Sequence, residues 1–211
     1  MSASVVVLDY GSGNLRSVAH ALERVGGDVT VTASGEDAMR AGGLVVPGVG
    51  HFGACITAIR DRGLDETITS FIATGRPVFA VCVGMQILFE GSDEAPDVPG
   101  LGVFHATVER LATKSDAGSP EKVPNMGWSR VTWTEPNHRY ASRSSALGRW
   151  FYFAHSYAAT MRHPVGQALH GTHAFAAAVA YENVFATQFH PEKSGDEGLA
   201  LYAAFTEEVA A

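Results

Sequence analysis

The chain has 211 residues, of which 46% are hydrophobic and 18% are charged, so it can bury a full core and is not dominated by disorder. Its 15 basic and 22 acidic side chains give a formal charge of −7. This balance argues against binding to a nucleic-acid backbone, which depends on Lys and Arg. Two cysteines exclude a disulfide scaffold, and we find no signal or membrane-spanning segment. We therefore expect one cytoplasmic domain over residues 1–211.

The first half of the chain alternates short apolar runs with segments of helical spacing. The apolar runs, which predict buried strands, are Val5–Leu8, Val29–Val31, Leu44–Val46 and Val78–Val81. The segments that predict helices are Leu15–Val25, Gly53–Asp61, Leu64–Thr74 and Met85–Glu90. Because strands that alternate with helices need crossover connections, this half predicts a mostly parallel sheet flanked by helices.

The second half has strand patterns without long helices between them, which predicts antiparallel additions to the sheet. These strands are expected over Val103–Leu111, Gly127–Trp133, Trp150–Phe153, Ala174–Ala180 and Val184–Phe189. A last helix is predicted over Asp196–Val209, with Ser194 and Glu197 as a capping box at its start. The polar stretch at residues 113–122 predicts a mobile surface loop, and residues 137–145 form a second polar, basic stretch. The predicted fold is therefore an open α/β sheet of the flavodoxin-like kind with added antiparallel strands.

Cys82 stands where the strand Val78–Val81 turns sharply into a helix. This is the arrangement of a nucleophile elbow, although Ala80 replaces the glycine that usually lies two residues before the nucleophile. A helix N-terminus stabilises a thiolate, and the backbone N–H of Val83 can contribute to an oxyanion hole. The alternative is a buried structural thiol, which is the interpretation we give to Cys55 within its helical pattern.

His190 and Glu192 follow the last predicted strand. Residues two apart in an extended segment point the same way, and Pro191 is expected to keep the chain extended between them. A His with a carboxylate behind it is the base and orienting group that a Cys nucleophile needs. By itself this pattern favours a surface His near a chain reversal, but together with Cys82 it predicts a triad at the carboxyl edge of the sheet.

Glycine turns and paired histidines offer further candidate sites. Gly48 and Gly50 follow a strand and allow close approach of backbone N–H groups to a ligand, so this turn is a second candidate for the oxyanion hole. The turn at residues 11–13 is not a dinucleotide site, because Arg16 stands where the third glycine would be. His170 and His173 lack the companions of a zinc site. We expect neither a cofactor nor a metal.

Several ordered motifs together resemble the class I (triad) glutamine amidotransferases. The three general motifs are Pro47-Gly48-Val49-Gly50, Cys82-Val83-Gly84-Met85-Gln86 and His190-Pro191-Glu192-Lys193-Ser194. Four others resemble, within that family, the glutaminase subunits of imidazole glycerol phosphate synthase: residues 9–15 (DYGSGNL), 50–53 (GHFG), 125–128 (NMGW) and 153–157 (FAHSY). The resemblance runs from Val5 to the last helix.

The resemblance implies a function for the chain: hydrolysis of glutamine to glutamate and ammonia through a thioester on Cys82, with His190 as proton shuttle and Glu192 orienting it. It also implies the other roles: an oxyanion hole from Gly50 and Val83, and glutamine contacts from Gly48, Gln86, Ser156 and Tyr157. Ammonia would pass to a (β/α)₈-barrel cyclase subunit, forming imidazole glycerol phosphate and aminoimidazole carboxamide ribotide in histidine biosynthesis. The positions that match partner-facing residues are Asn14, Met126 and Trp128.

Two residues depart from the family pattern. Asn125 replaces the usual His before Met126, and Ser129 replaces the usual Asn after Trp128, which puts in doubt the detail of the interface and not the chemistry. Besides a cysteine peptidase of similar fold, which would need a peptide groove, two alternative functions remain: the glutaminase subunit of pyridoxal phosphate synthase, and a catalytically silent binding subunit. The motifs at residues 9–15 and 126–128 disfavour the first, and an intact Cys, His and Glu set disfavours the second.

Overall fold

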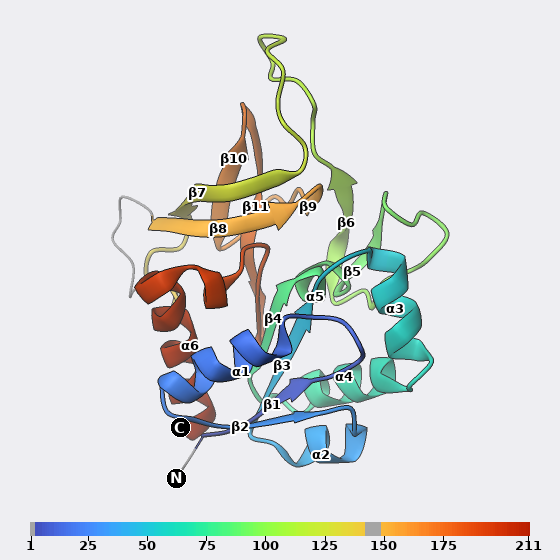
Figure 1. The fold of residues 1–211 in the computed structure, drawn as a ribbon, viewed down its shortest axis with the longest axis vertical. Helices are drawn as coiled ribbons and strands as arrows, with labels where there is room; N and C mark the ends of the chain where they lie inside the picture. Colours follow the sequence, from blue (N-terminus) through green and yellow to red (C-terminus); the bar gives the residue numbers. More distant parts are fainter. Residues whose placement is uncertain (1–2, 142–148) are drawn as a thin grey trace.

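A nine-stranded sheet forms the centre of the structure, a computed structural model that describes residues 3–141 and 149–211 (Figure 1). Its strand order is β2-β1-β3-β4-β12-β11-β10-β7-β8. The strands of this sheet are β1 (Ala3–Leu8), β2 (Gly27–Thr32), β3 (Gly43–Gly48), β4 (Val78–Cys82), β7 (Asn125–Trp133), β8 (Arg149–His155), β10 (Gly166–His170), β11 (His173–Tyr181) and β12 (Val184–Thr187). The helices are α1 (Leu15–Arg24), α2 (Gly35–Arg40), α3 (Phe52–Arg60), α4 (Leu64–Ala73), α5 (Val83–Gln86) and α6 (Gly195–Ala210), with a 3₁₀ turn η1 at Pro191–Lys193.

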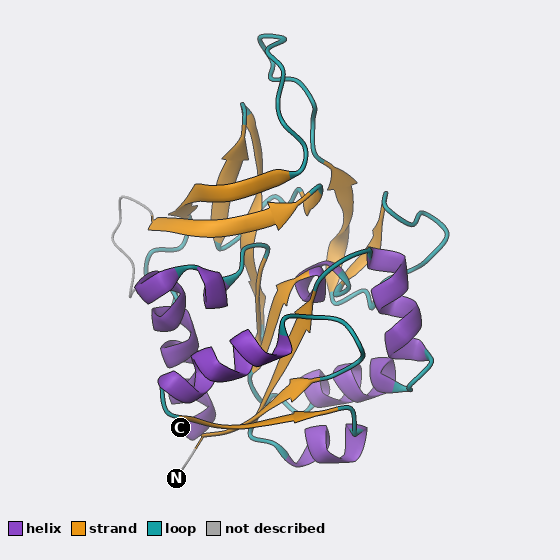
Figure 2. Ribbon diagram, viewed as in Figure 1, coloured by secondary structure: helices purple, strands orange, loops and turns teal. Residues whose placement is uncertain are grey.

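The first five strands in that order pair in parallel. This was predicted for β1, β2, β3 and β4 from their apolar runs, whereas β12 was expected among the antiparallel additions. Figure 2 shows helices on both faces of this half: α1 and α6 cover one face, and α2, α3 and α4 cover the other. Within β4 every residue is buried, because both faces of the strand are covered. The carboxyl ends of β3 and β4 lie level, with Gly48 opposite Cys82 in the register. This edge of the sheet therefore carries both the candidate nucleophile and the glycine turn.

The second half adds antiparallel strands, as expected. Strand β12 pairs in parallel with β4 on one side and antiparallel with β11 on the other, so it joins the two halves of the sheet. A separate three-stranded sheet contains β5 (Phe89–Ser92), β6 (Phe104–Arg110) and β9 (Tyr157–Ala159). The polar loop between β6 and β7 extends far from the body of the molecule, as predicted, and His170 and His173 bind its backbone carbonyls (Figure 1).

Some local predictions are wrong. The helix expected to continue to Glu90 ends after one turn at Gln86, and Phe89 instead enters β5, where its ring packs against Phe104 of the neighbouring strand. Neither α2 nor β10 was expected, because each is short: six residues in α2 and five in β10. Residues 142–145 of the second polar stretch lie outside the described residues.

The predicted capping box at the last helix does not form. The Ser194 hydroxyl donates to the carbonyl of His190 at 2.6 Å and accepts from the N–H of Tyr152 at 3.0 Å. Glu197 pairs with Arg149 instead of reaching back to the backbone. Ser194 therefore holds the segment that carries His190 against β8, and its side chain makes no capping hydrogen bond to α6.

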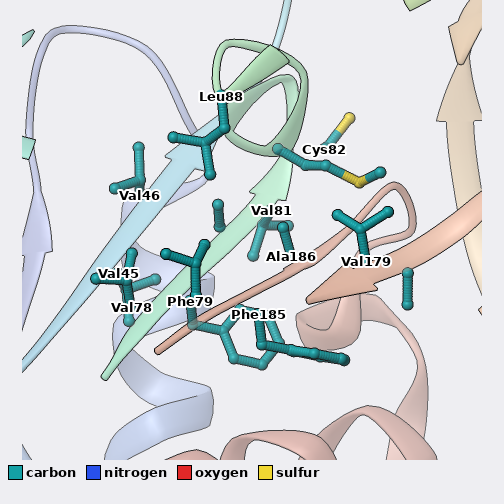
Figure 3. Packing of buried hydrophobic residues seen from close by; sticks show 14 of the residues in the cluster. Val45, Val46, Val78, Phe79, Val81, Cys82, Leu88, Val179, Phe185 and Ala186 are labelled. Atoms are coloured by element: carbon teal, nitrogen blue, oxygen red, sulfur yellow. The ribbon is translucent and has the colours of Figure 1, made fainter. Parts of the chain in front are cut away.

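The core beneath the candidate nucleophile is built from side chains of β3, β4, β11 and β12 (Figure 3). Phe79 stands at its centre and packs against four aromatic rings: Tyr140, Phe185, Tyr202 and Phe205. Burial of such rings is the largest local source of stability in a core. The packing fixes β4 below the turn that presents Cys82. None of the described helices is long and apolar enough to cross a membrane.

Candidate active site

Cys82 ends β4 in a strained backbone conformation. Its φ of 56° and ψ of −114° are rare for a residue with a side chain, and the next residue begins α5. Such a turn lifts the side chain above the strand ends, as the sequence predicts for an elbow. The structure thus gives Cys82 the geometry of a nucleophile, while Cys55 lies buried within α3 as expected of a core residue.

Two glycines make the elbow possible. A methyl group on Gly84 would meet the carbonyl oxygen of Val46 at 2.0 Å, and one on Gly48 would meet the N–H nitrogen of Gly84 at 2.4 Å. The end of β3 and the start of α5 are therefore in direct backbone contact. The Tyr10 hydroxyl completes this contact by donating to the carbonyl of Pro47 at 2.6 Å.

His190 and Glu192 meet as predicted, although by a different route. Their segment is not extended: Pro191 begins the 3₁₀ turn η1, and this turn brings Glu192 Oε1 to 2.9 Å from His190 Nδ1. Both side chains are almost fully buried. The extended conformation expected at Pro191 was wrong because the proline sits at the first position of a helical turn, where its fixed φ is favourable.

The electrostatics favour a protonated His190. Burial lowers the pKa of this imidazole, but hydrogen bonds to Cys82 and to Glu192 outweigh burial and raise the pKa to about 9. At neutral pH the ring therefore carries a proton beside the Cys82 sulfur, and the Glu192 carboxylate balances its charge. An imidazolium next to a thiol is the arrangement that generates a thiolate nucleophile.

A cavity of about 340 Å³ opens beside the sulfur. Most of the residues predicted for the site line it, namely Gly50, Cys82, Val83, Gln86, Met126, Ser156, Tyr157 and His190. Glu192 stands behind His190, and Gly48 lies buried beneath the turn, packed against α5 and away from the cavity lining. Asn14, at the start of α1, and Trp128, on β7, also lie outside this lining.

The turn after β3 supplies the second candidate oxyanion donor. The carbonyl of Val49 accepts from the Ser12 hydroxyl at 2.6 Å and from the Cys55 thiol at 3.5 Å. Because N–H and C=O point in opposite directions across a trans peptide, the N–H of Gly50 points away from Ser12. The first N–H groups of α5, including that of Val83, have no partner within the helix. Both donors belong to residues of the cavity wall.

Several residues of the site were not predicted from the sequence, among them Glu94, Gln188 and His155. Glu94 lines the cavity and accepts from the N–H of Phe52 at 2.7 Å. His155 also lines the cavity; it is 6% exposed, and burial lowers its pKa to about 4. Gln188 is a buried polar side chain next to Cys82 and outside the cavity lining. The spacing of Gln188, two residues before His190, was the available signal. Within residues 3–141 and 149–211, no cluster of His, Cys, Asp or Glu could hold a metal.

Comparisons with known proteins agree with this geometry. The family model described as "Glutamine amidotransferase class-I" matches residues 6–208. The chain is 47% identical to "Imidazole glycerol phosphate synthase subunit HisH" of Mycolicibacterium paratuberculosis, over 95% of both chains. It is 38% identical to "Imidazole glycerol phosphate synthase hisHF" of Emericella nidulans, covering 96% of this chain and 37% of that protein.

Solved structures share the fold at low sequence identity. One described as a glutamine amidotransferase superposes with a TM-score of 0.73 at 22% identity, covering 99% of this chain and 100% of the other. The PurLQS structure from Thermotoga maritima contains a chain that superposes with a TM-score of 0.76 at 17% identity, covering 98% of this chain and 99% of the other. These likenesses support the predicted flavodoxin-like α/β fold.

Proposed function

The chain belongs to the class-I glutamine amidotransferases, among the HisH-type glutaminase subunits of imidazole glycerol phosphate synthase, and on this premise we propose how its own residues release ammonia from glutamine. The observation that carries the proposal is the elbow Cys82 beside the buried His190–Glu192 pair. This geometry disfavours a catalytically silent subunit, because it keeps a protonated base beside a thiol, an arrangement that a binding role alone does not need.

The first half-reaction forms a thioester. The Cys82 thiolate attacks the side-chain amide carbon of glutamine, and the developing oxyanion is held by the N–H groups of Val83 and Gly50. Protonated His190 gives its proton to the amide nitrogen, the C–N bond breaks and ammonia leaves. Cys82 is then bound to a glutamyl group and His190 is neutral.

The second half-reaction returns the enzyme to its starting state. Neutral His190 removes a proton from water, and the resulting hydroxide attacks the thioester carbon. The C–S bond breaks, glutamate leaves and the Cys82 thiolate is restored beside protonated His190. Glu192 keeps Nδ1 of His190 occupied throughout, so that the other ring nitrogen faces the substrate.

Glutamine binding uses the remaining polar groups of the cavity. We assign the α-ammonium group to the Glu94 carboxylate, and the α-carboxylate to backbone N–H groups at Ser156 and Tyr157. Both N–H groups of the Gln86 amide are already donated to protein, so its oxygen remains to accept from the substrate. Gly48 contributes indirectly, by allowing the turn after β3 to pack on α5.

HisH-type subunits act with a cyclase subunit, and the Emericella relative is named as a combined hisHF protein. We place a (β/α)₈-barrel cyclase over the outer face of β7, where Met126 is 65% exposed and Trp128 is 54% exposed. Met126 also lines the cavity, so ammonia formed at Cys82 would leave directly beneath the partner. Asn14, at the start of α1, is a second predicted contact. The cytoplasmic location stays a prediction.

The experiment is glutamate release from glutamine, with and without the cognate cyclase and its ribonucleotide substrate. We expect the complex to be active and Cys82→Ser to lower its rate by about 10³-fold or more. The matched control is Cys55→Ser, which changes the other buried thiol and should keep the rate within about threefold. Full activity of Cys82→Ser would refute the triad, and activity that ignores the cyclase would refute the partner assignment.

A further inference from the structure

Gln188 is a fully buried amide that reaches the nucleophile. The residue is 0% exposed, and its Nε2 lies 3.7 Å from Cys82 Sγ, within hydrogen-bonding distance for sulfur. The Gln188 N–H donates to the carbonyl of Ala177, which continues the pairing of β12 with β11 past Thr187. Gln188 and His190 follow β12 across a bend at residues 188–189, and both side chains reach Cys82: Gln188 through its Nε2 and His190 through a hydrogen bond to the sulfur.

Neighbouring groups fix which end of the Gln188 amide faces the sulfur. Gln188 Oε1 accepts from Gln86 Nε2 at 2.9 Å, and the same Gln86 nitrogen donates to the carbonyl of Tyr157 at 2.9 Å. Turning Gln86 over would set its oxygen against a carbonyl oxygen. Turning Gln188 over would set its oxygen against the sulfur and its NH₂ group against that of Gln86. The network is satisfied in one orientation, with an N–H of Gln188 directed at Cys82.

A buried thiolate needs donors, because transfer of a charge from water to a protein interior is costly unless hydrogen bonds replace those of the solvent. His190 supplies one donor from one side. Gln188 supplies a second donor from the segment that follows β12 and also carries His190, and this donor does not take part in proton transfer. It therefore remains in place when His190 becomes neutral in the thioester state.

We propose that Gln188 is a catalytic hydrogen-bond donor to the Cys82 sulfur, which stabilises the thiolate both as resting nucleophile and as the group that leaves when the thioester is hydrolysed. The proposal rests on the proposed function of Cys82. It assigns to Gln188 a role separate from glutamine binding, since this side chain is not part of the cavity wall among the described residues. The hydrogen bond from Gln188 would favour the thiolate form of Cys82 over the thiol.

The test is the pH dependence of Cys82 alkylation by iodoacetamide, measured in a Cys55→Ser background so that all labelling reports on Cys82. We expect Gln188→Met to move the midpoint of the profile upward by about one pH unit, which lowers the rate about tenfold on the acidic limb. The plateau at high pH should stay within about threefold, because the thiolate itself remains reactive once formed. Loss of packing alone would leave the midpoint unchanged.

Two further variants complete the design. Gln188→Glu keeps the size of the side chain and replaces the donor by an acceptor, so it should move the midpoint upward at least as far as Gln188→Met. Thr187→Val is the matched control: its hydroxyl is equally buried and donates to the carbonyl of Phe189 at 3.0 Å, away from the sulfur. We expect it to leave the midpoint in place.

The outcomes separate this inference from the proposed function. Unchanged midpoints in both Gln188 variants, with activity abolished by Cys82→Ser, would overturn the role of Gln188 and leave the triad standing. If Gln188→Met does not fold, an unchanged midpoint in the isosteric Gln188→Glu still overturns the inference. An equal shift in Thr187→Val would also overturn the inference, because the effect would then come from disturbance of the strand.

Discussion

Replacement of Glu192 by Gln should destabilise the protein in a pH-dependent way. In the unfolded chain a histidine titrates near 6.5, whereas in the folded protein the pKa of His190 is raised to about 9. The native state thus binds this proton more tightly than the unfolded state. The stabilisation is fully present below pH 6.5 and is lost as the pH rises through 9. A shift of this size corresponds to roughly 3 kcal/mol, using about 1.4 kcal/mol per pH unit.

Glu192 and Cys82 both contribute hydrogen bonds and charge to that shift. If each supplies about half, Glu192→Gln should lower the free energy of unfolding by about 1.5 kcal/mol at pH 6. Above pH 9.5 the difference should approach zero or reverse, because wild type then keeps a buried carboxylate without a cationic partner. Urea unfolding of the two proteins at pH 6.0 and 9.5 measures this difference.

The control is Glu197→Gln, whose carboxylate pairs with Arg149 on the surface of the same region. Arginine keeps its charge over this range, so the cost of that substitution should be the same at both pH values. A Glu192→Gln cost that stays constant or grows with pH would refute a charged His190–Glu192 pair.

Two other substitutions test the elbow and the partner face. Gly84→Ala should lower the free energy of unfolding by about 3 kcal/mol or more, since the new methyl group would stand 2.0 Å from the carbonyl oxygen of Val46. In the control Gly91→Ala the methyl group meets no atom within 4 Å, so chemical denaturation should show a change below about 1 kcal/mol. Similar costs in the two variants would contradict the packing described. Trp128→Ala should weaken binding to the cyclase about 30-fold or more, measured by calorimetry, because exposed tryptophans are common anchors of protein interfaces. The control Val31→Ala lies on the edge strand β2 at the far end of the sheet and should have no effect. Equal affinities of wild type, Trp128→Ala and Val31→Ala would remove β7 from the interface.

The sequence predicted the parallel half of the fold well because its strands are buried on both faces. Runs such as Val5–Leu8 and Val78–Val81 have no other stable location than the centre of a covered sheet. The short elements were harder: β5 takes its pairing from β6, a contact that no local pattern contains. The helix predicted to continue to Glu90 therefore ended at Gln86.

Prediction of the site succeeded where chemistry and local spacing coincide. Cys82 at a strand end and the His190–Glu192 pair are visible in short motifs, and the structure brings them together. Glu94 and Gln188 were missed for a different reason. Their significance depends on what they contact across the fold, and 106 residues separate Gln188 from the sulfur that it faces.

The position of β12 in the sheet has a consequence for biosynthesis of the chain. This strand inserts between β4 and β11, so the ordered half that carries Cys82 ends in an open strand edge until the final quarter of the chain has been made. Pairings across so long a loop form late, because the entropy of closing the loop must be overcome before any contact is gained. A ribosome-bound chain that has emerged only as far as β8 already contains the thiol but has no base. Insertion of one strand then closes the exposed edge and brings the proposed base next to the proposed nucleophile in the same folding event.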